Sequence, residues 1–228
     1  MPASRQRAPL RLALALMVAA VLSLAASGPA VAATAPVSIV AQVGYSGFVK
    51  AQQWMPVTID VTNHGPDIDG TLEVSAAVAF NGPPTGSAVY QTHLSLATGA
   101  TKHLKTYLIE DQAPSPVSVR IVQNGRVVAS ADAQSATAAT ALIGVLSDQP
   151  TALDNFAAVH PAGLSANVVH LSLDTLGDSA IQLRAFDLLA IDDFATDTLT
   201  SAQRGALTDF VQNGGALAAD RRSDTDAG

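Results

Sequence analysis

Hydrophobic and polar residues alternate along the chain from Pro36 to about Ala133. In Val57–Val61 valine and isoleucine alternate with threonine and aspartate, and Leu72–Phe80 and Val117–Ile121 repeat the pattern. A period of two is typical of strands with one buried and one exposed face. The pattern predicts about seven strands, near residues 37–43, 56–62, 71–80, 88–96, 102–110, 116–123 and 126–132.

Turn residues separate these strands, and Asn124-Gly125 is the strongest turn signal because both residues tolerate the positive φ of a two-residue hairpin. A second hairpin is predicted over Leu94–Lys102. Its flanking residues, His93 and His103, could lie diagonally on one polar face, but no third metal ligand is fixed by the sequence. Both are interpreted as surface histidines.

Seven short antiparallel strands over about 100 residues are typical of an immunoglobulin-like (Ig-like) β-sandwich. This sandwich is predicted over residues 33–133. Residues 131–141, "ADAQSATAATA", contain no large side chain and predict an Ala/Ser/Thr linker to a second domain.

Beyond the linker the pattern changes to continuous apolar runs that alternate with helical segments. Strands are predicted at 141–146, 168–171 and 188–191, and helices near 151–159, 178–186 and 200–211. Continuous apolar strands of this kind indicate a parallel sheet covered on both faces. The predicted fold class is therefore α+β and multidomain, with an antiparallel sandwich followed by a partial α/β parallel-sheet unit over residues 141–219.

The helix near residues 200–211 is the best specified element. Thr200 and Gln203 have the spacing of a capping box, in which each side chain bonds the other residue's backbone N–H. Asn213-Gly214 supplies residues that tolerate a left-handed C-terminal cap.

The N-terminus has the pattern of a secretory signal peptide, predicted over residues 1–32. Three arginines lie within the first eleven residues, Leu12–Ala26 is an uncharged apolar run, and Ala30-Val31-Ala32 has the small-x-small pattern of a cleavage site. Fifteen residues are fewer than the roughly 20 that a membrane-spanning helix needs. The signal would engage the secretion machinery and place the protein outside the cytoplasm; a retained N-terminal anchor is the alternative.

Charge and cysteine content narrow the function classes. Without residues 1–32, which hold three arginines and no acidic residue, nine basic and 19 acidic side chains remain, a net charge of −10. A surface of this sign repels phosphate backbones, so nucleic acid is not expected as a partner. Cysteine is absent, which excludes disulfides, thiolate metal sites and a cysteine nucleophile.

Two segments carry a resemblance to a known family. "DLLAIDDFATDTLTSAQRGALTDFVQNGGAL" (Asp187–Leu217) and "PVTIDVTNHGPDIDGTLEV" (Pro56–Val74) resemble segments of uncharacterised bacterial extracytoplasmic proteins. These proteins join an Ig-like sandwich to a domain resembling class I glutamine amidotransferases, followed by a transmembrane helix. The resemblance implies that the second unit is flavodoxin/amidotransferase-like and that full-length relatives are membrane-anchored.

The sequence also departs from that family. Amidotransferases use a cysteine nucleophile and a His–Glu pair, and neither is found here, so no catalytic residue is assigned. The family continues beyond the Gly-Gly-x-Leu strand, whereas residues 220–228 are polar and are predicted to be a disordered tail. We therefore expect a truncated chain or a shifted reading frame at this end.

Three functions remain open from the sequence. The first is an exported, non-catalytic binding or scaffold protein of the bacterial cell envelope, with an unidentified protein or envelope partner, no cofactor and no metal site. The second is an enzyme that uses the carboxylates of Asp148, Asp192 and Asp193, with Asp174 nearby, to hold Mg²⁺ at the carboxyl ends of the parallel strands. These aspartates are also interpretable as helix caps and loop residues. The third is a non-functional truncated fragment.

Overall fold

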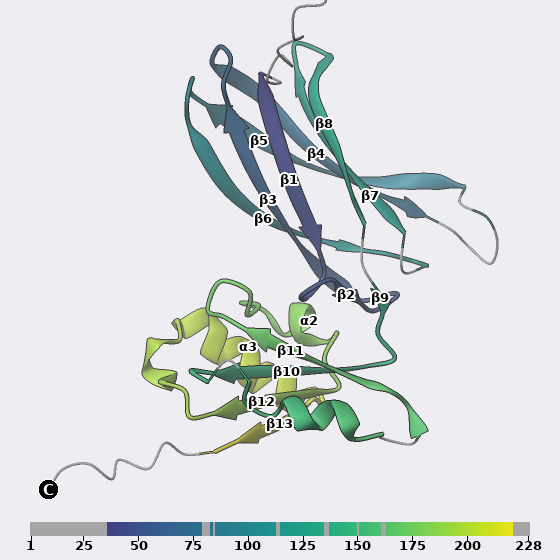
Figure 1. The fold of residues 1–228 in the computed structure, drawn as a ribbon, viewed down its shortest axis with the longest axis vertical. Helices are drawn as coiled ribbons and strands as arrows, with labels where there is room; N and C mark the ends of the chain where they lie inside the picture. The colour runs from purple at the N-terminus through teal and green to yellow at the C-terminus, as the bar shows by residue number, and fades with distance from the viewer. Residues whose placement is uncertain are drawn as a thin grey trace, which may run out of the picture. The chain divides into compact units, whose positions relative to one another are not determined.

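The computed structural model describes residues 36–220, apart from residues 79–82, 84, 113–114, 135–136, 150 and 161–162. All described residues belong to one compact unit of the chain. The predicted signal peptide and residues 221–228 of the predicted tail lie outside them. The described part is an α+β protein with antiparallel and parallel sheets and few helices (Figure 1). None of its helices is long and apolar enough to cross a membrane.

Seven strands form two antiparallel sheets, as the alternation predicts. One sheet has the strand order β1-β3-β6 and the other has β5-β4-β7-β8. The strands are β1 (Val37–Val43), β3 (Trp54–Asn63), β4 (Ile68–Val78), β5 (Gly86–Leu96), β6 (Thr101–Ile109), β7 (Pro116–Gln123) and β8 (Arg126–Gln134).

Both antiparallel sheets contribute to one hydrophobic core. Val57, Ile59 and Val61 of β3 are fully buried, and so are Val117 and the other inward-facing residues of β7. The predicted hairpin between β7 and β8 is confirmed, with Asn124 and Gly125 at φ values of 52° and 74°. Burial of alternate side chains on facing strands is the main force that holds this part of the fold together.

The predicted hairpin over Leu94–Lys102 is wrong. β5 pairs with β4 along its whole length, whereas β6 pairs with β3 in the other sheet. The chain crosses between sheets because Leu94 and Leu96 point into the shared core and Asn63 N–H, on β3, bonds Ala100 O.

The predicted linker, residues 131–141, contains strands and buried residues. Ala133 lies in β8, and Ala133, Ala139 and Ala141 are buried. The short strand β9 (Thr137–Ala138) of this region pairs in parallel with β2 (Phe48–Val49). A run of small residues is therefore not excluded from the core. The domain boundary itself stays a prediction.

The second half of the described chain forms a four-stranded parallel sheet with the order β11-β10-β12-β13. Its central strand β10 is buried at six consecutive positions, as its continuous apolar sequence predicts. The edge strand β13 is exposed throughout. The strands are β10 (Ala141–Ser147), β11 (Ala166–Leu171), β12 (Leu188–Asp192) and β13 (Ala216–Ala219).

Both faces of this sheet are covered. On one face Leu142, Leu146 and Leu189 pack in the main core, which also contains Leu183 of α2 (Ala180–Leu183) and Phe210 of α3 (Ser201–Gln212). On the other face a smaller cluster around Ile143 and Val145 packs against Leu153 and Phe156, beside the 3-10 helix η1 (Asp154–Ala158).

Two predicted helices are shorter than expected. The segment near 151–159 is reduced to η1 because Leu153, at φ 60°, is in the left-handed region and cannot continue a helix. The segment near 178–186 forms only the single turn of α2, after which Phe186 turns into the core.

The third predicted helix, α3 (Ser201–Gln212), is confirmed with its caps. Thr200 Oγ1 accepts from Gln203 N and Gln203 Oε1 accepts from Thr200 N, each at 3.1 Å. Gly214, at φ 91°, supplies the left-handed residue after the helix. A second 3-10 helix, η3 (Thr196–Thr198), precedes α3.

Candidate functional site

The aspartates predicted to bind a ligand lie at the carboxyl edge of the parallel sheet. Ser147, the last residue of β10, is in register with Asp192, the last residue of β12. Asp148 and Asp193 follow directly, so the three predicted residues lie at the ends of adjacent strands. Asp174 lies in the turn after β11, and its backbone carbonyl accepts a hydrogen bond from Lys105 Nζ.

Proximity along one edge does not make these carboxylates a metal centre. Across the described part of the chain, no three or more His, Asp or Glu side chains come together in a group that could hold a metal ion. A magnesium site of protein carboxylates needs at least one or two of them directed at the ion together with further oxygen ligands. The assignment of Asp148, Asp192 and Asp193 to ligand binding therefore stays a prediction.

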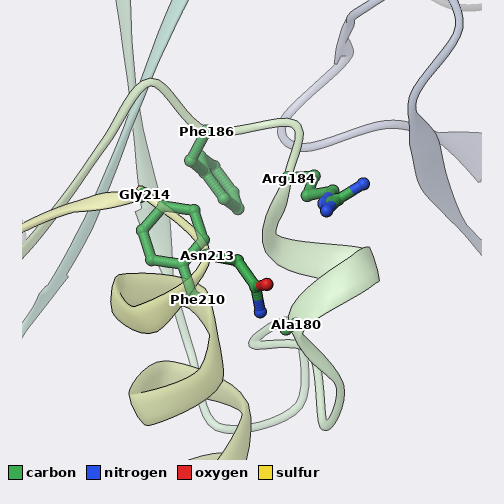
Figure 2. A pocket seen from close by; sticks show the side chains of 7 residues that line it. Ala180, Arg184, Phe186, Phe210, Asn213 and Gly214 are labelled. Carbon is green, nitrogen blue, oxygen red and sulfur yellow. The ribbon is translucent and has the colours of Figure 1, made fainter.

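A hollow of about 190 Å³ lies at the opposite, amino edge of the same sheet (Figure 2). It forms where α2, the residues before β12 and the turn between α3 and β13 meet. The hollow is lined by Ala180, Arg184, Phe186, Phe210, Asn213, Gly214 and Gly215. The two phenylalanines are buried, and Arg184 and Asn213 are exposed.

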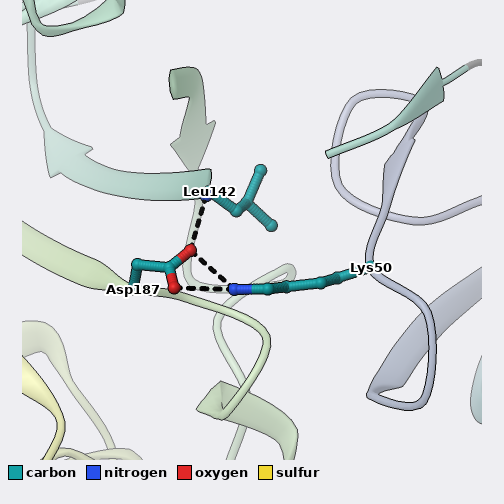
Figure 3. A network of polar contacts seen from close by, with 3 residues as sticks. All are labelled: Lys50, Leu142 and Asp187. Carbon is teal, nitrogen blue, oxygen red and sulfur yellow. Dashed lines mark hydrogen bonds and ion pairs between the residues drawn. The ribbon is translucent and has the colours of Figure 1, made fainter. Parts of the chain in front are cut away.

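A polar network at this amino edge joins the parallel sheet to the antiparallel part of the chain (Figure 3). Lys50 Nζ lies 2.7 Å and 2.6 Å from the two carboxylate oxygens of Asp187. Asp187 Oδ2 also accepts from Leu142 N, at the start of β10, at 2.8 Å. One carboxylate therefore binds both the start of the central strand β10 and a lysine 137 residues away.

An aromatic contact lies beside this network. The rings of Tyr45 and Phe186 have their centroids 4.5 Å apart with an interplanar angle of 53°. Tyr45 Oη donates to Gln182 O, the backbone carbonyl in α2, at 3.1 Å. Burial raises the pKa of the Tyr45 phenol far above its ordinary value, with a smaller contribution from Tyr107, so the hydroxyl stays protonated and remains a donor.

A second polar contact comes from β6. Lys105 Nζ donates to Asp174 O at 2.5 Å and lies 5.4 Å from the centroid of the Tyr107 ring. Partial burial lowers the pKa of Lys105, and the charges of Asp178 and Asp174 oppose that shift. Burial, with Asp178, raises the pKa of Tyr107 to about 12. The contact ties β6 to the turn that follows β11.

His93 and His103 do not lie next to each other, and each is paired with a different aspartate. His93 Nε2 lies 3.4 Å from Asp69, His103 Nδ1 lies 2.7 Å from Asp60, and both pairs are exposed. His93 and His103 lie in different sheets, so their predicted diagonal placement on one hairpin is wrong.

Sequence reasoning did not identify the residues of the amino edge. Lys50, Asp187 and Tyr45 carry no motif, because their partners lie more than 130 residues away in the chain. The only local signal is an aspartate directly before a predicted strand, which many loops also show.

Asp187 is expected to matter more for stability than Lys50 does. Because Asp187→Ala leaves the Leu142 amide without its acceptor, it should cost about 2 kcal/mol in the free energy of unfolding. Lys50→Ala removes only a partly exposed ion pair and should cost less than about 1 kcal/mol. Asp187→Asn can keep the acceptor and should fall between them. Urea unfolding of the three variants measures the order; equal costs for both alanine variants would contradict it.

Comparisons with known proteins bear mainly on the first half of the described chain. Residues 36–136 match the model of a family described as a domain of unknown function, DUF8726. The matched segment contains both antiparallel sheets and ends before β10. A search of curated proteins finds no match.

Several solved structures are similar to part of the chain at low TM-score. They include the alkylpurine DNA glycosylase AlkC of Pseudomonas fluorescens, bound to DNA containing an abasic site analog, at TM-score 0.33 and 19% identity, over 44% of this chain and 30% of that chain. The β-glucosidase of Listeria innocua in complex with glucose follows at TM-score 0.31 and 10% identity, over 43% of this chain and 16% of that chain. The GH3 β-glucosidase of Bifidobacterium adolescentis has TM-score 0.30 and 16% identity, over 43% and 17%. The chain thus spans less than a third of each of these proteins.

Proposed function

We propose that the chain is an exported, non-catalytic binding or scaffold protein of the bacterial cell envelope. In this proposal an Ig-like sandwich is joined to a flavodoxin/amidotransferase-like unit, and the partner is a protein or another envelope component. The signal pattern of residues 1–32 supports export.

The strand orders support the two fold assignments. Two antiparallel sheets with the orders β1-β3-β6 and β5-β4-β7-β8 share one core, as the sheets of an Ig-like sandwich do. Numbered from β10, the parallel sheet has the order 2-1-3-4, which is the beginning of the flavodoxin-like order 2-1-3-4-5.

The observation that carries the scaffold proposal is the filled contact between the antiparallel sheets and the parallel sheet. Small-molecule sites of enzymes lie preferentially at domain interfaces. Here that position is occupied by protein: Tyr45 and Phe186 are buried against each other, and Lys50 is bound to Asp187. A closed joint of this kind favours rigid presentation of surfaces to a partner over catalysis between the units.

A reporter fusion tests export. Alkaline phosphatase fused after residue 228 is active only outside the cytoplasm, so the full chain should give active reporter in a bacterial host. The chain without residues 1–32 should give equal protein and no activity. Inactive full-length fusion, or activity in both, would overturn the export proposal.

A metal titration tests the proposal that the protein is not a magnesium-dependent enzyme. Mg²⁺ at millimolar concentration should leave the melting temperature of the protein unchanged. A rise that is lost in Asp192→Asn and kept in Asp197→Asn, an exposed aspartate of η3, would instead establish the carboxylate site and overturn the proposal.

A further inference from the structure

The strand β13 forms one edge of the parallel sheet and pairs only with β12 among the described strands (Figure 1). All residues of β13, Ala216–Ala219, are exposed, and none of them is charged. Strands of parallel sheets are normally buried, and natural edge strands are usually protected by a charge, a proline or a covering segment. β13 contains neither charge nor proline, and no described segment buries it.

The backbone groups of β13 alternate between the two sides of the strand. Asp220 N, directly after β13, donates to Ile191 O of β12 at 2.9 Å. In a parallel ladder every second residue bonds the neighbouring strand, so the even-numbered residues of β13 bond β12. The N–H and C=O groups of Leu217 and Ala219 therefore point away from β12, toward the open edge of the sheet.

We propose that the open edge of β13 pairs with the same edge of a second copy of this chain, antiparallel and about a two-fold axis at Ala218. In this register Leu217 of each copy exchanges both backbone hydrogen bonds with Ala219 of the other copy. The two parallel sheets then become halves of one continuous sheet. A two-fold contact of this kind is self-complementary and closes after two copies.

The charges near β13 are compatible with a second copy as the occupant. β13 contains no charge that would select a strand of opposite sign. The two-fold register places Asp220 of one copy opposite Ala216 of the other, so this acid does not meet its like. The whole chain has a net charge of −7, so two copies repel each other at long range. Because salt screens that repulsion, the dimer should become stronger as salt is added.

We expect the dimer to be weak. The four residues of β13 in each copy bury much less than the roughly 1,200 Å² of a stable complex, so the Kd should be on the order of 100 µM. The pairing does not depend on export or on the scaffold proposal.

A single cysteine tests the register, because the chain has no cysteine of its own. Opposed residues of a non-hydrogen-bonded antiparallel pair have Cα atoms about 4.5 Å apart, which a disulfide can span. Ala218→Cys should therefore form a covalent dimer with oxidised glutathione. Ala202→Cys, at an exposed position of α3, is the matched control and should cross-link far less at the same concentration. Equal cross-linking of the two variants would overturn the proposal.

Sedimentation equilibrium measures the dimer without a cross-link. The Kd of the unmodified chain should fall when NaCl is raised from about 50 mM to about 500 mM. Ala219→Pro removes an outward N–H but no bond to β12, so it should weaken the dimer at least about tenfold and leave the melting temperature nearly unchanged. Ala219→Val keeps that N–H and should stay dimeric. A chain that is monomeric throughout, a dimer that Ala219→Pro does not weaken, or larger assemblies in place of a dimer would each rule out this pairing.

Discussion

Asn63→Ala is expected to lower the free energy of unfolding by about 3 kcal/mol, because the Asn63 side chain closes a buried corner between the two antiparallel sheets. Asn63 is completely buried at the end of β3. Its Nδ2 donates to Pro66 O at 2.8 Å and lies 3.3 Å from the carbonyl oxygens of Leu96 and Ala97, while Oδ1 accepts from Gly65 N at 2.9 Å. Alanine would remove the side-chain partner of all four backbone groups, and the bond to Leu96 O is lost in a buried position.

Equilibrium urea unfolding measures this cost. Asn155→Ala, which removes an exposed asparagine of η1, is the matched control and should change stability by less than about 0.5 kcal/mol. Asn63→Asp separates the two kinds of bond, since it keeps the acceptor for Gly65 and loses the donors. If Asn63→Ala were no more destabilising than the control, the corner would have no energetic role.

The antiparallel half of the fold could be predicted because its information is local. Each strand has its own alternation, and Val37–Val43 and Pro116–Gln123 are found at the predicted bounds. Alternation does not say which strand is the neighbour, however. The segment 94–102 has the sequence of a hairpin, yet the core places its two arms in different sheets.

Helices were predicted well only where the sequence specifies both ends. Thr200 and Gln203 fix the start of α3 and Gly214 fixes its end, and all three act as predicted. The Ser179 side chain makes no capping bond at the start of α2, and Leu153 adopts a left-handed backbone before η1. In such short segments tertiary packing decides the backbone, and a helical pattern alone overestimates the length.

In the candidate sites, too, local features could be predicted from the sequence and features that depend on tertiary packing could not. The carboxyl-edge aspartates could be placed from sequence because a residue that follows a parallel strand must lie at that edge. Their geometry as ligands could not be placed, since it depends on side-chain directions. The amino-edge hollow and the Lys50–Asp187 network depend on residues distant in sequence, and a single sequence contains no signal for such pairs.

Phe186→Ala is expected to have the largest effect on stability, about 4 kcal/mol. Phe186 occupies the point where the parallel sheet meets the antiparallel part of the chain. Its ring packs on Tyr45, and a Cβ on Gly144 in β10 would lie 2.9 Å from it, so the ring fills space directly against a central strand. Its removal leaves a cavity next to the hollow that it lines, and the cost should lie near the middle of the range for a buried phenylalanine.

A double-mutant cycle separates the energy of the Tyr45–Phe186 ring contact from the cost of losing core volume. Phe186→Leu and Tyr45→Leu keep most of the buried volume and should show a coupling free energy of about 1 kcal/mol, because the aromatic pair is lost only once. The same Phe186 variant combined with Tyr90→Leu, which disturbs the separate Trp54–Tyr90 contact, should be additive. Urea unfolding of the single and double variants gives both values. Additive costs for Phe186 and Tyr45 would mean that the ring pair does not couple the two parts of the chain, and the rigid joint on which the scaffold proposal depends would lose its physical basis.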